Sequence, residues 1–318
     1  MSTHPKPKFN VNLSALRRHY YLDQYVIIAP GRNNRPHGFT NLATPHVVVN
    51  AACPFCLDGE PTILAVPNLE HWRVRVVANA YPAVSLTNPN AYGAMEVVIE
   101  SPDHTQEFSS LSVSHIETIL RVYTERIASL SILPGIRYVL AFKNDGPLAG
   151  TSVTHTHSQI MALPLMPPRI EAEHVALSSY QDKHGTCAVC DLGCWEVEQN
   201  QRLITADSEL LTIAPYASTH PYEAWFITKR HTTRLADLTA GELRRLATSL
   251  KYVTERLDRD LISFNFFVQE ALPGDNHHLI IKLEPRVPMF YGGGEMATGI
   301  IINTIAPETV PHWYNETI

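Results

Sequence analysis

The feature that most constrains the fold is a repeated order of cysteines and histidines. The chain holds two C-x-x-C pairs, and each pair is followed by a histidine, a segment with helical periodicity and another histidine. The first set comprises Cys53, Cys56, His104 and His155, and the second comprises Cys187, Cys190, His231 and His278. The repeat unit is roughly 130 residues, far longer than a solenoid repeat, so the sequence predicts two similar halves rather than an array.

The segments between these residues predict the same elements in each half. Each half has a helical pattern with a capping box at its start, Ser114 with Glu117 in the first and Thr239 with Glu242 in the second. The corresponding strand-like apolar runs are 74–84 and 136–144 in the first half, and 210–220 and 262–270 in the second. This pattern predicts an α+β protein with a mainly antiparallel sheet, in which the two units share one sheet or core.

We expect the halves to span residues 1–175 and 176–318, connected by the proline-containing segment 164–174. The formal net charge is −6, and no cluster of Lys and Arg is longer than two residues, which argues against a nucleic-acid partner. The sequence has no apolar segment of signal-peptide length at its start and no run of about 18 apolar residues. We therefore expect no membrane partner and a cytoplasmic location.

The two C-x-x-C pairs favour metal binding over other uses of cysteine. In a reducing compartment such pairs are metal ligands or redox centres more often than disulfides. A thioredoxin-like redox centre would need the pair at the start of a helix in a βαβ unit, and neither pair is predicted to have that setting. Two cysteines and two histidines satisfy tetrahedral zinc, so the sequence predicts two closed structural zinc sites. Buried thiols and core histidines are the alternative, and in the second set His277 and Cys194 are adjacent alternative ligands.

His157 is a candidate nucleophile because it is not needed as a metal ligand. If His155 binds zinc, His157 lies two residues further along a strand, with Gln159 on the same face. At the equivalent positions of the second half stand Ile280 and Lys282, so only the first half has this pair. A neutral imidazole beside an amide suits attack on phosphorus, and activity should fall as the imidazole is protonated.

The loop before His155 is a candidate phosphate-binding segment. It contains Asn144, Gly150, Thr151 and Ser152, which combine close backbone approach with amide and hydroxyl groups. An ordinary polar connection between strands is the alternative explanation.

Several motifs across the chain resemble those of a known family. The segment "NDGPLAGTSVTHTHSQIMALP" is similar to the active-site segment of the galactose-1-phosphate uridylyltransferase family, a branch of the histidine-triad superfamily that includes ADP-glucose phosphorylase. The family's other motifs also have counterparts here, namely "RNNRP", "CPFC", "VRVVAN", "SPDH", "CAVC", "TKRH" and "GGGEMATGIIINTIAPE". The resemblance implies a histidine-triad-like α+β fold over nearly the whole chain.

The resemblance also implies roles for individual residues. His157 would be the nucleophile that accepts a nucleoside monophosphate, and Gln159 and Ser152 would hold the phosphates. Nucleoside and phosphate contacts would come from Asn79 and Asn144, and Arg32 and Arg35 would lie near the nucleotide. A second subunit would complete the site with sugar contacts around Glu295, so a homodimer is expected by analogy.

Two departures from the uridylyltransferase pattern point toward the ADP-glucose phosphorylase branch. Many uridylyltransferases have an H-x-H pair in the late strand as part of an additional metal site with an upstream Glu. Here Glu173 matches that Glu, but Ile280 and Lys282 replace the histidines, and Met289 replaces a lysine that contacts the sugar.

The sequence therefore predicts a nucleotidyltransferase that works through a nucleotidyl-histidine. Its substrates would be a nucleotide sugar and, as acceptor, either a sugar-1-phosphate or inorganic phosphate. A hydrolase of the same superfamily, with water as the acceptor, is one alternative. A zinc-stabilised nucleotide-binding protein without turnover is another.

Overall fold

A large antiparallel sheet forms the framework of the protein. The computed structural model describes residues 13–34, 53–56, 61–272, 274–287 and 292–316, and within these ranges the sheet has ten strands. In spatial order they are β3 (Thr62–Val66), β4 (Val74–Ala78), β5 (Ala94–Ile99), β7 (His157–Leu163), β6 (Tyr138–Asp145), β11 (Ser263–Gln269), β12 (Ile280–Arg286), β10 (Ala224–Thr228), β9 (Leu210–Ile213) and β8 (Leu203–Ala206). Neighbouring strands are antiparallel throughout this sheet.

The sequence repeat is visible in the order of these strands. Outward from the centre, the first half runs β6, β7, β5, β4 and β3, and the second runs β11, β12, β10, β9 and β8. The two halves meet where β6 pairs antiparallel with β11. The prediction of an α+β protein with two similar halves in one sheet is confirmed. The boundary between residues 175 and 176 stays a prediction, and both residues lie within the helix α2 (Pro168–His184).

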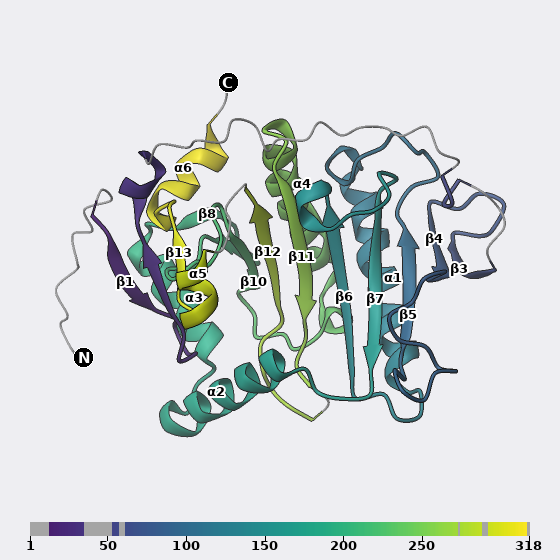
Figure 1. Cartoon of the computed structure of the whole chain (residues 1–318), viewed down its shortest axis with the longest axis horizontal. Helices are drawn as coiled ribbons and strands as arrows, with labels where there is room; N and C mark the ends of the chain where they lie inside the picture. Colours follow the sequence, from purple (N-terminus) through teal and green to yellow (C-terminus); the bar gives the residue numbers. More distant parts are fainter. Residues whose placement is uncertain (1–12, 35–52, 57–60, 273, 288–291, 317–318) are drawn as a thin grey trace.

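One face of the large sheet is covered by two long helices, α1 (Val113–Ser131) and α4 (Ala240–Arg259), which lie behind it in Figure 1. Apolar residues at helical spacing, such as Ile116 and Leu250, pack with the apolar residues that alternate along the strands, such as Ile160 and Phe266. The resulting core is continuous across both halves.

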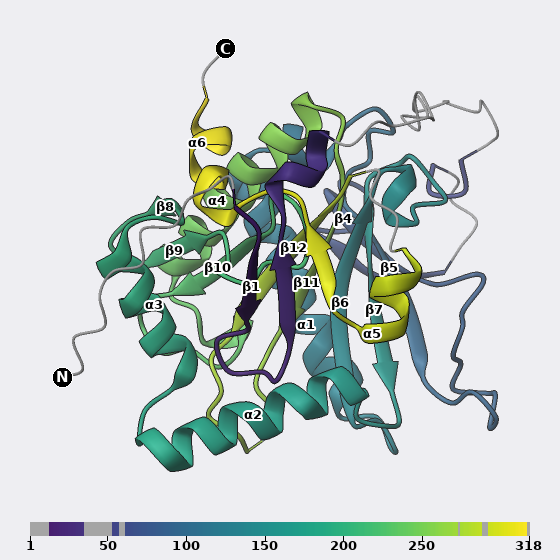
Figure 2. The ribbon, with the colours of Figure 1, turned by 60° about the vertical axis from the view of Figure 1, so that its left-hand side comes forward.

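The opposite face of the second half is covered by further elements. A small sheet of β1 (Ala15–Arg18), β2 (Tyr25–Ile28) and β13 (Ile301–Asn303) lies in front of β12 and β11, with α2 below it (Figure 2). The helix α3 (Ala188–Gln199) follows α2, and Leu177 and Leu192 pack with Trp225 and Ile280 of the large sheet. The remaining helices are α5 (Gly293–Thr298), α6 (Val310–Asn315) and the short 3-10 helices η1 (Pro30–Asn34), η2 (Phe108–Ser110), η3 (Pro147–Ala149), η4 (Leu235–Asp237) and η5 (Pro307–Thr309).

The two predicted capping boxes have different outcomes. The Thr239–Glu242 box is confirmed, since the Thr239 hydroxyl accepts from Glu242 N and the Glu242 carboxylate accepts from Thr239 N. The Ser114–Glu117 box is wrong, because α1 begins at Val113 and the Ser112 hydroxyl caps it by accepting from His115 N.

The described helices include none that is both long and apolar enough to cross a membrane.

Removing either N-cap hydroxyl should destabilise its helix. We expect Thr239→Ala and Ser112→Ala each to lower the free energy of unfolding by about 1 kcal/mol, because a backbone N–H at the helix start loses its acceptor. Urea denaturation followed by circular dichroism measures this. The matched control is Ser114→Ala, which should change the free energy by less than about 0.5 kcal/mol. An equal loss in Ser114→Ala would contradict the assignment of Ser112 as the cap.

Candidate functional site

The first cysteine and histidine set forms a compact cluster in the folded chain. The ligand atoms of Cys53, Cys56, His104 and His155 lie within 4.8 Å of one another. Cys56 Sγ lies 3.4 Å from Nδ1 of both histidines, and Cys53 Sγ lies 3.6 Å from His155 Nδ1. Sulfur and nitrogen ligands bound to one tetrahedral zinc would be separated by about 3.6 Å. The cluster could therefore hold a metal ion with little rearrangement.

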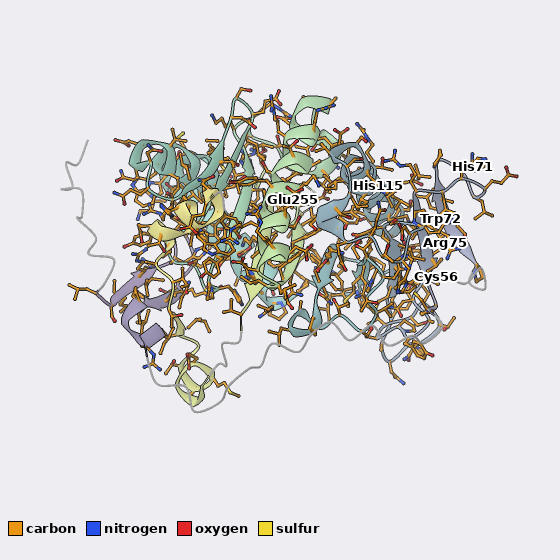
Figure 3. The ribbon with its side chains drawn as sticks, turned by 90° about the horizontal axis from the view of Figure 1, so that it is seen from above. Cys56, His71, Trp72, Arg75, His115 and Glu255 are labelled. Atoms are coloured by element: carbon orange, nitrogen blue, oxygen red, sulfur yellow. The ribbon has the colours of Figure 1, made fainter. Side chains whose placement is uncertain are left out.

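Neighbouring groups orient this cluster. His155 is fully buried, and its Nε2 donates to the carbonyl of Ser101 at 2.7 Å, which leaves the lone pair of Nδ1 directed toward the cysteines. Arg75 on β4 donates to the carbonyl of Phe55, inside the C-x-x-C turn, and its guanidinium lies 4.9 Å from the centre of the Trp72 ring. Cys56, Trp72 and Arg75 are grouped at one end of the molecule (Figure 3).

The second set forms an equivalent cluster. Cys190 Sγ lies 3.3 Å from His231 Nδ1 and 3.4 Å from His278 Nδ1, and Cys187 completes the group. Both Nε2 atoms are hydrogen-bonded here, since that of His231 donates to the Asn276 side chain and that of His278 to the Thr228 hydroxyl; in the first cluster the Nε2 of His155 is held in the same way. The neighbouring His277 belongs to a different group of side chains.

The position of Cys187 corrects one expectation about the second C-x-x-C pair. Cys187 is the N-cap of α3, so this pair does start a helix. The preceding element is α2 rather than a strand, so the βαβ setting of a thioredoxin-like centre is still missing.

His157 is the first residue of β7, and His155 lies before the strand rather than in it. His157 pairs with Ile99 and Gln159 with Val97 on β5, which puts both side chains on the face opposite α1 and α4. The Nδ1 of His157 donates to the carbonyl of His155 at 2.9 Å, so Nε2 carries the lone pair. Burial, together with the positive charge of Lys143, lowers the pKa of His157 to about 4, so the imidazole is neutral at pH 7.

Two hollows meet at His157. One has a volume of about 540 Å³ and combines the apolar side chains of β4 and β5 with Asn79 and Gln159, whose amides lie 3.3 Å apart. The other has a volume of about 300 Å³ and is lined by the loop that contains Asn144 and Ser152. His157 and Ser152 line both hollows.

Other predicted site residues lie elsewhere. Arg32 is in η1 and Glu295 is in α5, and neither lines these two hollows in the described part of the chain. Arg35 and Met289 lie outside the described residues.

The loop between β6 and β7 is shaped by glycines and by a residue from the second half. Gly146 and Gly150 have φ of 83° and 86°, and a Cβ on Gly146 would lie only 2.3 Å from the Ser263 hydroxyl. The side chain of Asn265 on β11 donates to the Asn144 side chain at 2.8 Å and to the carbonyl of Ala149 at 2.9 Å. This role of Asn265 could not be inferred from the sequence, because it depends on the pairing of β6 with β11.

A buried ion pair lies directly beneath His157. Lys143 Nζ donates to the Glu100 carboxylate at 2.8 Å, to the Thr156 hydroxyl at 3.1 Å and to the carbonyl of His157 at 3.1 Å, and both charged side chains are at most 1% exposed. Burial alone would raise the pKa of Glu100, but Lys143 and the hydrogen bonds from Thr156 and Ser158 hold it below its usual value. The sequence shows a single Lys at the end of the apolar run 138–143, but nothing in it indicates that Glu100 is the partner.

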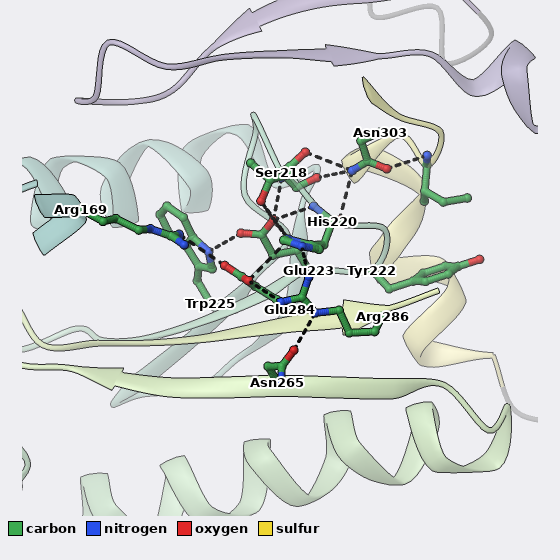
Figure 4. Close-up of polar contacts among 12 residues, drawn as sticks. Arg169, Ser218, His220, Tyr222, Glu223, Trp225, Asn265, Glu284, Arg286 and Asn303 are labelled. Atoms are coloured by element: carbon green, nitrogen blue, oxygen red, sulfur yellow. Dashed lines mark hydrogen bonds and ion pairs between the residues drawn. The ribbon is translucent and has the colours of Figure 1, made fainter. Parts of the chain in front are cut away.

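The corresponding face of the second half is filled by its own polar network. Ile280 and Lys282 occupy β12 as predicted, and Lys282 Nζ lies 2.6 Å from the Glu173 carboxylate on α2. Glu284 on the same strand pairs with Arg169 (Figure 4). Glu173 and Glu284 are therefore each paired with a basic side chain of the same chain.

Comparison with known proteins agrees with this architecture. The family described as "Galactose-1-phosphate uridyl transferase, N-terminal domain" matches residues 70–167. ADP-glucose phosphorylase from Arabidopsis thaliana is 30% identical over 93% of this chain and 90% of its own length. Galactose-1-phosphate uridylyltransferase from Thermotoga maritima is 26% identical over 77% of this chain and 76% of its own.

Solved structures of an ADP-glucose phosphorylase and a uridylyltransferase are also similar to this chain over most of its length. The crystal structure of the Arabidopsis thaliana ADP-glucose phosphorylase with bound ADP-glucose has a TM-score of 0.84 and 29% identity, and it covers 96% of this chain and 99% of its own. A uridylyltransferase structure has a TM-score of 0.73 and 26% identity, with 95% and 97% coverage.

The chain is a nucleotidyltransferase of the histidine-triad-like α+β class. It belongs to the galactose-1-phosphate uridylyltransferase family, which confirms the resemblance of the motifs. These relatives are named as transferases and a phosphorylase, so neither the hydrolase nor the non-catalytic binding protein is favoured.

Breaking the buried pair beneath His157 should strongly destabilise the protein. In Lys143→Met the Glu100 carboxylate loses its counter-charge, and we expect the free energy of unfolding in urea to fall by about 3–5 kcal/mol. The double variant Lys143→Met/Glu100→Gln removes both charges and should recover part of that loss. A double variant as unstable as the sum of the two single variants would contradict a direct interaction.

Proposed function

We propose that this enzyme transfers a nucleotide from a nucleoside-diphosphate sugar to inorganic phosphate, as the name of the ADP-glucose phosphorylase relative implies. His157 Nε2 forms a bond to the α-phosphorus, and the bond from that phosphorus to the bridging oxygen breaks. The sugar-1-phosphate leaves with the electron pair. A phosphate oxygen then attacks the same phosphorus, displaces the imidazole and gives a nucleoside diphosphate.

The observation that carries this proposal is the hydrogen bond from His157 Nδ1 to the carbonyl of His155 at 2.9 Å. It fixes the neutral tautomer whose lone pair is on Nε2, which is the form that can attack phosphorus. Burial keeps the pKa of this imidazole at about 4, so the nucleophilic form predominates at neutral pH.

The surrounding groups are suited to the developing charge on the phosphates. Gln159 lies two residues along β7 from His157 and lines the larger hollow with Asn79, so its amide can donate to a phosphate oxygen. On the other side, Asn144 and Ser152 line the smaller hollow, and Gly150 permits close approach of the backbone. We assign the apolar part of the larger hollow to the nucleoside.

We propose that both cysteine and histidine clusters hold structural zinc. Each has four protein ligands and no position for substrate, and the separations between sulfur and nitrogen of 3.3–3.6 Å suit tetrahedral coordination. When bound, the metal would supply folding energy rather than chemistry.

Phosphate is favoured over a hexose-1-phosphate as the acceptor because the similarity to the phosphorylase extends over more of the chain than that to the uridylyltransferases. Uridylyl transfer to galactose-1-phosphate is the second candidate, supported by the family itself.

We further propose a cytoplasmic homodimer in which Glu295 of one subunit contacts the sugar bound to the other, with Arg32 and Arg35 near the nucleotide.

Product analysis tests the choice of acceptor. The protein is incubated with ADP-glucose or UDP-glucose, and with phosphate, galactose-1-phosphate or neither. We expect the nucleoside diphosphate, and repeated turnover to glucose-1-phosphate, only when phosphate is present; without an acceptor, labelling of His157 releases at most one equivalent of glucose-1-phosphate per subunit. Formation of a galactose nucleotide instead would identify a uridylyltransferase, and release of the nucleoside monophosphate without an acceptor would identify a hydrolase.

Replacing the two histidines should have different consequences. We expect His157→Asn to keep its bound zinc but to lose covalent labelling by a nucleotide sugar labelled in the α-phosphate. His155→Ala should lose one zinc ion and unfold at lower temperature. Metal analysis and protein labelling are measured on the same preparations, and loss of zinc in His157→Asn or persistent labelling would reverse the assignment.

A further inference from the structure

A third group of possible metal ligands lies outside the two cysteine clusters. His174 lies on α2, and Asp275 and His277 precede β12, and the ligand atoms of these three residues lie within 4.8 Å of one another. We propose that these three side chains bind a divalent transition-metal ion at a site distinct from the two zinc clusters.

The contact between His174 and Asp275 has the geometry of two ligands rather than of a hydrogen bond. His174 Nδ1 lies 2.9 Å from Asp275 Oδ2. Among the described residues, His174 Nδ1 is nevertheless a buried nitrogen with no hydrogen-bond partner, so the proton of the ring does not point at the carboxylate. Two ligand atoms at about 2.1 Å from one metal ion, at right angles, would be separated by about 3 Å.

The donor set selects the class of metal. Two imidazoles with one carboxylate suit Zn²⁺, Co²⁺ or Fe²⁺, whereas Mg²⁺ and Ca²⁺ prefer oxygen ligands. The side chains of His174 and Asp275 are 31% and 27% exposed, so water can supply the remaining ligands and the metal can exchange. The Ser178 hydroxyl, one turn further along α2, lies 3.2 Å from His277 Nε2 and orients that ring.

A metal at this site would connect two distant segments of the chain. Its ligands come from residues 174 and 275–277, so binding would hold α2 against the loop that also carries His278 of the second cysteine cluster. Because these ligands are far apart in the unfolded chain, the metal would bind the folded protein preferentially and raise its melting temperature. This site is independent of the proposed nucleotide transfer.

Metal stoichiometry tests the proposal. Protein purified with its tightly bound metal is dialysed to remove weakly bound ions, then equilibrated with ZnCl₂, and the metal content is measured by mass spectrometry. We expect the wild type to bind one equivalent more than His174→Ala and Asp275→Asn. The matched control is His184→Ala, an exposed histidine on the same helix, which should bind as much as the wild type.

A parallel titration with CoCl₂ distinguishes this site from exchange at the cysteine clusters. Cobalt at the proposed site should give weak visible bands without charge-transfer absorption from thiolates, and should raise the melting temperature of the wild type but not of Asp275→Asn. The proposal is overturned if the wild type binds no more metal than His174→Ala and Asp275→Asn, or if the additional cobalt shows thiolate absorption. Each comparison is a difference between folded variants, so it does not depend on whether the enzyme transfers nucleotides.

Discussion

The antiparallel pairing of β6 with β11 is the interaction on which the rest of the structure depends. It joins the two halves into one sheet and makes the core beneath α1 and α4 continuous. It also brings Asn265 of the second half against Asn144 and the carbonyl of Ala149, so the loop beside His157 is held from both halves. The second half has no counterpart of His157, but its Asn265 holds the loop between β6 and β7 that lines the hollow beside His157.

The two halves differ in what covers the face opposite the long helices. In the second half, α2 and the small sheet lie over this face, and the charged side chains of β12 are paired with α2 through Glu173 and Arg169. In the first half, the same face carries His157 and Gln159 beside hollows that meet at the imidazole. Lys282 occupies the position of Gln159, and its ammonium group neutralises Glu173 where the uridylyltransferase pattern would have histidines. The two similar halves therefore differ at this face, which is open beside His157 in the first half and filled by ion pairs in the second.

Much of the fold could be predicted because the cysteines and histidines recur in the same order in both halves, and because helices and strands are indicated by the spacing of apolar residues along the chain. Thr239 was identified as a cap because its box coincides with the start of α4, whereas the competing Ser112, two residues before Ser114, could be recognised only once the start of α1 was known. The ion pair of Lys143 with Glu100 could not be predicted, because its partners are 43 residues apart and are brought together by the order β5, β7, β6. The expectation that His155 and His157 share a strand was wrong, because β7 begins at His157. The two residues are still connected, since the ring of His157 donates to the carbonyl of His155.

The spacing of two residues between the histidines allows His155 to contact both the cysteines and the ring of His157. The ring of His155 is fixed by the carbonyl of Ser101 on one side and the cysteines on the other, and its own carbonyl accepts the Nδ1 proton of His157. In addition, the ammonium group of Lys143 donates a hydrogen bond to the carbonyl of His157. A metal ion in the first cluster would therefore restrain His157, the proposed nucleophile, through the backbone, since it would immobilise the His155 carbonyl that sets the tautomer of His157. A histidine placed elsewhere in the cluster could bind the metal equally well, but its carbonyl could not accept the Nδ1 proton of His157 and so could not orient that imidazole.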